Sequence, residues 1–214
     1  MGPQNPDSPH PDSPRSGVTR RAFIKGVIAS GAVATSAAYM FRSAGEIFGQ
    51  TSAPGSVERL ITLNVNGQMR PVDVMKQETL AMTLRYKLGL TGTKIGCDRA
   101  ECGACTVLID EVPHYSCSVL THTVRGRKVQ TIEGLANGDR LHPVQQAIVD
   151  EQGFQCAFCM SGFTMAAVGF LKESPNPTRQ QLAHGISGNL CRCQDYDKIL
   201  TAFMQGAEYM RRTT

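Results

Sequence analysis

The sequence has little excess of charge of either sign. Its 214 residues carry 22 Lys and Arg against 18 Asp and Glu, a formal net charge of +4. This near balance argues against a polyanion such as nucleic acid as a partner. A short basic run, RGRK at 125–128, is more typical of a solvated strand end than of a nucleic-acid contact.

Two other features are missing. No Gly-rich loop of the kind that cradles phosphates is present, so nothing in the sequence indicates a flavin or a nicotinamide nucleotide on this chain. The sequence also lacks a long apolar run. The stretch from Val27 to Phe41 has 15 residues, softened by Gly, Ala, Ser and Thr, which is too short to span a bilayer comfortably.

Residues 1–54 have the composition of a leader and linker. Residues 1–19 are rich in Pro, Ser and Asp and are expected to be disordered. The following TRRAFIK, at 19–25, matches the twin-arginine export motif at every key position, although an ordinary amphipathic helix is the alternative. Export to the periplasm is therefore expected. No clean Ala-x-Ala site follows Phe41, so an uncleaved segment could also hold the protein at a membrane.

The next part of the chain has an α+β pattern. Asn66-Gly67 separates two alternating segments and predicts a β-hairpin, because both turn positions need positive φ. Residues 78–90 have apolar positions at helical spacing. Residues 106–112 and 128–135 are each typical of a strand. A small mixed sheet packed on one helix is expected.

The pattern changes after about Leu141. Pro143 suits the first turn of a helix, and Thr178 is a plausible N-cap. The segments at 142–152, 161–174, 176–190 and 196–212 each predict a helix. A second, all-α domain is therefore expected, most simply a bundle.

Eight cysteines fall into two sets. The first cysteine set is Cys97, Cys102, Cys105 and Cys117, and the second cysteine set is Cys156, Cys159, Cys191 and Cys193. Disulfides are awkward, because a C-x-C pair does not suit the geometry that a disulfide needs. Structural zinc sites use short C-x2-C pairs, so zinc binding remains an alternative for the second cysteine set. The C-x4-C-x2-C spacing of the first set is typical of a plant-type [2Fe–2S] loop, in which Gly96 and Gly103 allow close backbone approach.

Longer motifs carry a resemblance to a known family. They are GCDRAECGACTVLIDEVPHYSC at 96–117, then TIEGL, LHPVQQAI, GFQCAFCMSG and GNLCRCQDYDKI. From about Arg59 to Met210, the chain resembles the small iron–sulfur subunit of the xanthine oxidase family of molybdenum hydroxylases. The leader is similar to that of exported bacterial aldehyde oxidoreductases.

The resemblance implies a fold, cofactors and a partner. It implies a ferredoxin-like (β-grasp) domain at 55–137 and a helical-bundle domain at 138–214, each holding one [2Fe–2S] cluster on its cysteine set. It also implies a large partner subunit that carries molybdenum on a molybdopterin cytosine dinucleotide. Gln155 and Cys193 match the residues that contact the pterin, so the second cluster is expected to lie nearer molybdenum.

The expected function is electron transfer. The chain would pass electrons from the partner's molybdenum site through both clusters to a flavin subunit, a c-type cytochrome or a quinone-linked partner, and no catalytic residue is expected on it. Aldehydes are the first expectation for the substrate, with N-heteroaromatics such as nicotinate as the alternative. A free-standing ferredoxin-like carrier and a zinc-binding interaction protein are alternatives of other classes.

Some positions depart from the family pattern. Ala100 stands where the family mostly has glycine, and alanine costs about 1 kcal/mol there if its φ is positive. CMSG at 159–162 replaces the commoner C-T-P-G, and Gln194-Asp195 replaces Thr-Gly. None of these changes removes a cysteine.

Overall fold

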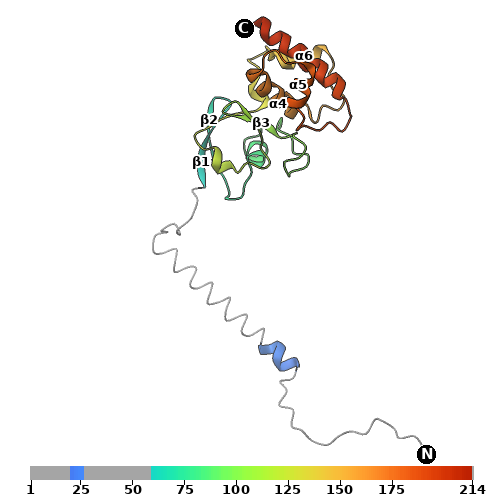
Figure 1. Ribbon diagram of the computed structural model, residues 1–214. Helices are drawn as coiled ribbons and strands as arrows, with labels where there is room; N and C mark the ends of the chain where they lie inside the picture. Colours follow the sequence, from blue (N-terminus) through green and yellow to red (C-terminus); the bar gives the residue numbers. More distant parts are fainter. Residues whose placement is uncertain (1–19, 27–58, 214) are drawn as a thin grey trace, which may run out of the picture. The chain divides into compact units, whose positions relative to one another are not determined.

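The computed structural model describes residues 20–26 and 59–213 (Figure 1). Residues 20–26, which include the arginine pair, form a short helix with exposed side chains. The expectations for the leader 1–19, the apolar stretch and the linker fall outside the described residues. Within the described part of the chain, no helix is long and apolar enough to cross a membrane.

Residues 60–130 form a five-stranded mixed sheet. Its strands are β1 (Leu60–Val65), β2 (Gln68–Asp73), β3 (Thr106–Ile109), β4 (Val112–Tyr115) and β5 (Lys128–Gln130). Their order across the sheet is β2-β1-β5-β3-β4. β1 and β5 run parallel, and every other neighbouring pair is antiparallel.

The predicted hairpin between β1 and β2 is confirmed. Asn66 has φ 54° and Gly67 has φ 76°, as the tight turn between paired strands requires. The Asn66 side chain also accepts a 2.8 Å bond from the backbone N–H of Thr131, just after β5. The turn residue therefore helps to fix the end of a strand far along the sequence.

The expected strand at 106–112 is wrong in extent. β3 ends at Ile109, because Asp110 (φ 50°) and Glu111 (φ 72°) make a turn that reverses the chain into β4. The Asp110 carboxylate holds this turn by accepting bonds from Arg127 Nε at 2.7 Å and the Lys128 backbone at 2.9 Å. An Asp-Glu turn has no glycine to signal it, so the sequence pattern missed β4.

The predicted helix after β2 is present but unusual. It starts as α2 (Leu80–Met82), which is capped by Thr79, and widens into one π-helical stretch at Thr83–Lys87. Gly89, with φ 70°, follows its end. Buried Glu78 braces the start of the helix by accepting a 2.8 Å bond from the Thr83 hydroxyl.

All four predicted helices of the second part are confirmed. They are α3 (Pro143–Asp150), α4 (Met160–Glu173), α5 (Arg179–Gly185) and α6 (Tyr196–Thr213). Pro143 occupies the first turn of α3, and Thr178 caps α5 in a capping box. Phe163 and Phe203, both 1% exposed or less, pack in their common core.

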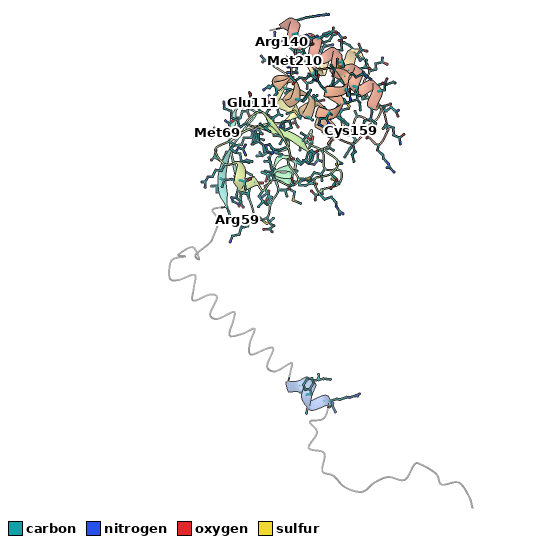
Figure 2. The ribbon with its side chains drawn as sticks, viewed as in Figure 1. Arg59, Met69, Glu111, Arg140, Cys159 and Met210 are labelled. Carbon is teal, nitrogen blue, oxygen red and sulfur yellow. The ribbon has the colours of Figure 1, made fainter. Side chains whose placement is uncertain are left out.

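Helix α4 packs directly on the strand-bearing part. A Cβ at Gly162 would collide with the backbone oxygen of Gly103, and a Cβ at Gly169 would collide with Pro113. Gly162 therefore lets α4 approach the loop before β3, and Gly169 lets it approach β4. Figure 2 shows Cys159, which immediately precedes α4, away from the end of the helical part where Arg140 and Met210 lie.

Candidate metal centre

The first cysteine set lies on two neighbouring loops. Cys97, Cys102 and Cys105 follow one another on the loop that leads into β3, and Cys117 lies just after β4. Cys105 and Cys117 are buried, while Cys97 and Cys102 are partly exposed. The backbone N–H of Ser116 donates to the Cys105 carbonyl at 3.3 Å, which ties the two loops together.

Backbone N–H groups of the first loop point at its sulfurs. Ala100 N donates to Cys117 Sγ at 3.3 Å, and Cys102 N donates to Cys97 Sγ at 3.3 Å. Ala100 has φ 59°, a positive value at which alanine is strained and glycine is not. N–H bonds from Arg99 and Glu101 lower the pKa of Cys97 to about 7, so this loop favours a thiolate at that position.

The second cysteine set joins three helices. Cys156 and Cys159 lie immediately before α4, and Cys191 and Cys193 lie on the loop between α5 and α6. Ala157 (φ 58°) and Gln194 (φ 64°) give these two segments their sharp turns. The backbone N–H of Phe158 lowers the pKa of the exposed Cys156 thiol.

The eight cysteines are free thiols that lie in pairs. Cys156 Sγ is 3.3 Å from Cys193 Sγ, well beyond the roughly 2.05 Å of a disulfide. Burial raises the pKa of Cys159 to about 12, and the neighbouring Cys191 thiol adds to the rise. In the first cysteine set, burial likewise raises the pKa of Cys105 to about 12, beside Cys117. Cys97 and Cys102 make the remaining pair, through a bond between their side chains.

Paired thiols suit a two-iron cluster. Each iron of a [2Fe–2S] centre takes two protein thiolates, so four cysteines in two pairs supply what one cluster needs. Two buried neighbouring thiols hold their protons tightly, and iron binding would have to displace those protons. Within residues 20–26 and 59–213, no three His, Cys, Asp or Glu side chains converge on one ion position.

The two cysteine sets are joined by hydrogen bonds. Leu190 N donates to the Cys102 carbonyl at 2.9 Å, and buried Asn189 donates from Nδ2 to the Gly103 carbonyl at 2.8 Å. Gly103 has φ 69°, and a Cβ there would lie 2.6 Å from the Asn189 side-chain carbon. Sequence reasoning missed Asn189, because its partner lies 86 residues away. A cavity of about 760 Å³ is lined by cysteines of both sets.

Gln155 lies beside the second cysteine set with an acidic neighbour. Its Nε2 donates to Asp195 Oδ1 at 3.1 Å, across 40 residues of sequence. Both residues line a small cavity together with all four cysteines of the second set. Asp195 was visible in the sequence only as a departure from the family pattern, and its contact with Gln155 was not foreseen.

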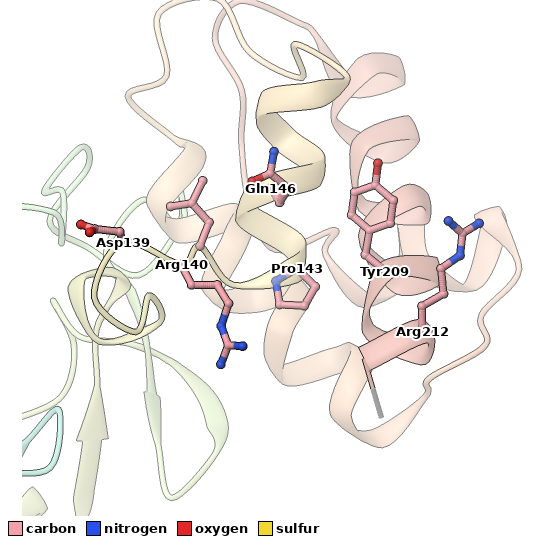
Figure 3. A pocket seen from close by; sticks show the side chains of 7 residues that line it. Asp139, Arg140, Pro143, Gln146, Tyr209 and Arg212 are labelled. Atoms are coloured by element: carbon pink, nitrogen blue, oxygen red, sulfur yellow. The ribbon is translucent and has the colours of Figure 1, made fainter.

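A third cavity lies away from the cysteines. It has a volume of about 670 Å³ and opens between the loop at 139–141 and the helices α3 and α6. Figure 3 shows Pro143 and Gln146 of α3 facing Tyr209 and Arg212 of α6, with Asp139 and Arg140 on the loop. No cysteine lines it, so it is separate from the candidate metal centre.

Comparison with known proteins bears on this arrangement. Residues 63–130 match the model of a 2Fe-2S iron-sulfur cluster binding domain, and residues 131–204 match that of a [2Fe-2S] binding domain. The chain is 43% identical over 156 residues to one of the subunits of nicotinate dehydrogenase from Pseudomonas putida, covering 73% of this chain and 99% of the relative. It belongs to the small [2Fe–2S] subunits of the xanthine oxidase family of molybdenum hydroxylases.

Other members of the family support the same assignment. The aldehyde oxidoreductase iron-sulfur-binding subunit of Escherichia coli is 37% identical over 190 residues, covering 81% of this chain and 82% of the relative. The structure of quinoline 2-oxidoreductase from Pseudomonas putida has a TM-score of 0.69 at 40% identity, covering 72% of this chain and 98% of that chain. Members of this family are iron–sulfur, electron-transfer subunits of oxidoreductases, and this chain is one of them.

Proposed function

We propose that this chain binds one [2Fe–2S] cluster on each cysteine set. Cys97, Cys102, Cys105 and Cys117 hold the first, and Cys156, Cys159, Cys191 and Cys193 hold the second. The first belongs to a ferredoxin-like domain at 55–137 and the second to a helical-bundle domain at 138–214. The carrying observation is that each set supplies two pairs of thiols on loops held by hydrogen bonds.

The chain itself contributes position and electrostatics. When bound, the two clusters supply one-electron carriers between a molybdenum site on a partner and an external acceptor. The N–H groups that point at Cys97 and Cys117 stabilise negative charge on those sulfurs. The bond between Leu190 and Cys102 keeps the two loops at a fixed separation.

The partner is a large subunit carrying molybdenum on a molybdopterin cytosine dinucleotide. Gln155 is exposed and Cys193 is partly exposed, so both are within reach of a group held by another chain. We propose that these two residues contact the pterin, which makes the second cysteine set the one nearer molybdenum. The acceptor at the other end is a flavin subunit or a c-type cytochrome.

The substrate is an aldehyde or an N-heteroaromatic compound. The similarity to the aldehyde oxidoreductase relative covers 81% of this chain, which is more than residues 59–214 can supply, so it extends into the segment before Arg59. This favours an aldehyde. The higher identity to the nicotinate dehydrogenase relative, 43% against 37%, favours the N-heteroaromatic alternative.

The site of action is the periplasm. TRRAFIK at 19–25 supports export by the twin-arginine route, which accepts proteins already folded around their cofactors. Cysteines that already ligate iron in the cytosol would reach the oxidising compartment protected from disulfide formation. An uncleaved segment would leave the protein associated with the membrane.

Metal analysis tests the cluster assignment. The purified complex is expected to contain about four irons and about four acid-labile sulfides per copy of this chain, with two distinct paramagnetic signals after reduction. Cys105→Ser and Cys191→Ser should each lower the iron to about two per chain and remove a different signal. Stoichiometric zinc without labile sulfide would instead identify a zinc-binding protein.

Co-purification and turnover test the partner and the substrate. A tag on this chain should recover a large subunit that contains molybdenum. The recovered complex should then oxidise either simple aldehydes or nicotinate-like heteroaromatics in the presence of an artificial acceptor. Recovery of the chain alone, with both clusters intact, would support a free-standing carrier.

A further inference from the structure

Asp195 is an acidic residue inside the second cysteine site. It lies two residues after Cys193 and immediately before α6. Its carboxylate lines the same small cavity as all four cysteines of the second set. No role follows for it from the cysteine ligation, because eight cysteines already supply eight ligands.

The two oxygens of Asp195 have different surroundings. Oδ1 accepts the 3.1 Å bond from Gln155 Nε2. Oδ2 is buried and has no hydrogen-bond partner among the described residues. The carboxylate makes no ion pair with any described Lys, Arg or His either. A buried carboxylate oxygen without a donor is costly, which argues for a function that needs the charge at this place.

The contact fixes the orientation of the Gln155 amide. A carboxylate oxygen can only accept a hydrogen bond, so the end of the amide that faces Asp195 must be Nε2. The carbonyl oxygen Oε1 is then left to accept a bond from an N–H group outside the chain. Gln155 is exposed, so such a donor can reach it.

The charge also acts on the cysteine site. A negative charge in a partly buried setting is screened less than one in water, so it opposes the addition of an electron to a nearby centre. The matching carboxylate of Asp197, two residues further on, is neutralised by Arg179 at 2.6 Å and its side chain is 95% exposed. The two acids therefore differ in environment while lying on the same segment.

We propose that Asp195 is a positioning and tuning residue. It holds the Gln155 amide with Oε1 outward, and its charge lowers the reduction potential of the centre on the second cysteine set. This inference rests on the proposed function, because it requires an iron–sulfur centre at that site. It predicts that the chain presents a hydrogen-bond acceptor, and not a donor, to the group that Gln155 contacts.

The charge is tested by redox titration of the intact complex with Asp195→Asn. Removing the charge should raise the potential of the centre on the second set, so that its reduced-to-oxidised ratio at a fixed potential increases about tenfold, or about 59 mV for one electron. The paramagnetic signal assigned to the first set should keep its potential. Asp197→Asn is the matched control and should change neither, because that charge is exposed and already paired.

The positioning role needs a second measurement. Asp195→Asn and Asp195→Ala both lack the charge, but only Asp195→Ala frees the Gln155 amide, so in rapid mixing without acceptor substrate should reduce the second-set centre several-fold more slowly in Asp195→Ala than in Asp195→Asn. Gln155→Ala should slow this step similarly while leaving the potential near that of the unmodified complex. In the Gln155→Ala background, Asp195→Asn should still raise the potential, since the charge acts directly.

The outcomes separate this inference from the proposed function. An unmodified complex without two iron–sulfur signals would overturn the proposed function. Two normal signals with an unchanged potential in Asp195→Asn would overturn the tuning role alone. An equal rise of the potential in Asp195→Asn and Asp197→Asn would mean that the effect is one of general surface charge. Equally rapid reduction in Asp195→Ala and Asp195→Asn would remove the positioning role.

Discussion

The backbone N–H of Leu190 donates a 2.9 Å hydrogen bond to the carbonyl oxygen of Cys102. Leu190 precedes Cys191 of the second cysteine set, and Cys102 belongs to the first. This hydrogen bond therefore links Cys102 of the first set to the residue that precedes Cys191 of the second set. Asn189 stabilises the same junction through its bond to the Gly103 carbonyl.

Asn189→Ala is expected to weaken this junction. The substitution removes the 2.8 Å bond to the buried Gly103 carbonyl, which keeps its two bonds from Thr106, so the free energy of unfolding should fall by about 0.5–1.5 kcal/mol. Urea denaturation of the iron-loaded complex measures the loss. Asn137→Ala is the control, since the bonds of Asn137 to Arg140 are made by the backbone, and it should change stability by less than about 0.5 kcal/mol.

Ala100→Gly is expected to stabilise the first cysteine loop. Ala100 has φ 59°, a conformation that costs alanine about 1 kcal/mol and glycine nearly nothing. The midpoint of thermal unfolding should therefore rise by a few degrees. Ala136→Gly, at a loop position without positive φ, should lower the midpoint; a rise of equal size there would assign the gain to something other than backbone strain.

Glu78 is expected to make stability depend on pH in the acid range. Burial alone would raise its pKa, but bonds from Lys87 Nζ, the Met75 backbone and the Thr83 hydroxyl outweigh burial and lower it. A lowered folded-state pKa means that the stabilisation is present above the unfolded pKa and is lost as pH falls through the folded value. Glu78→Gln should cost about 2 kcal/mol near neutral pH and less in acid.

Denaturant midpoints of the two proteins, compared from about pH 7 down to about pH 3, measure this difference. Glu111→Gln is the control, because the Glu111 side chain is 74% exposed in its pair with Lys172. A constant difference between Glu78→Gln and the unmodified protein across this range would contradict the assignment.

Arg20→Lys with Arg21→Lys is expected to hold the complex in the cytoplasm. Both arginines lie in the twin-arginine pattern at 19–25, and lysine keeps the charge but not the guanidinium geometry. Cell fractionation followed by iron and activity measurements locates the protein. Arg15→Lys with Arg42→Lys lies outside the motif and should leave export unchanged; normal periplasmic activity of the Arg20 and Arg21 variant would argue against this route.

Cys105→Ser and Cys191→Ser are expected to interrupt electron transfer at different places. In rapid mixing with substrate and without acceptor, the Cys105 variant should still reduce its remaining centre, because the second cysteine set is proposed to lie nearer molybdenum. The Cys191 variant should reduce its remaining centre slowly or not at all. Equally rapid reduction in both variants, with the complex intact, would reverse the proposed order.

The sequence determined the features that rest on local chemistry. Asn66-Gly67 specified its turn because both residues accept positive φ, and Thr178 specified a helix start because its hydroxyl accepts from Gln181 N. The four helices followed from apolar spacing, and the family followed from the order and spacing of the cysteines. The strained φ of Ala100 was also foreseeable, because alanine stood at a position of the cysteine loop that usually needs glycine.

Only the tertiary structure decided which distant groups meet. The pairing of Cys156 with Cys193, the bond from Asn189 to Gly103 and the contact between Gln155 and Asp195 join residues 37, 86 and 40 positions apart. The close approach of α4 that Gly162 permits brings this helix beside Gly103, whose carbonyl is the partner of Asn189. Such contacts depend on how whole elements pack, and no local propensity or spacing rule encodes that packing.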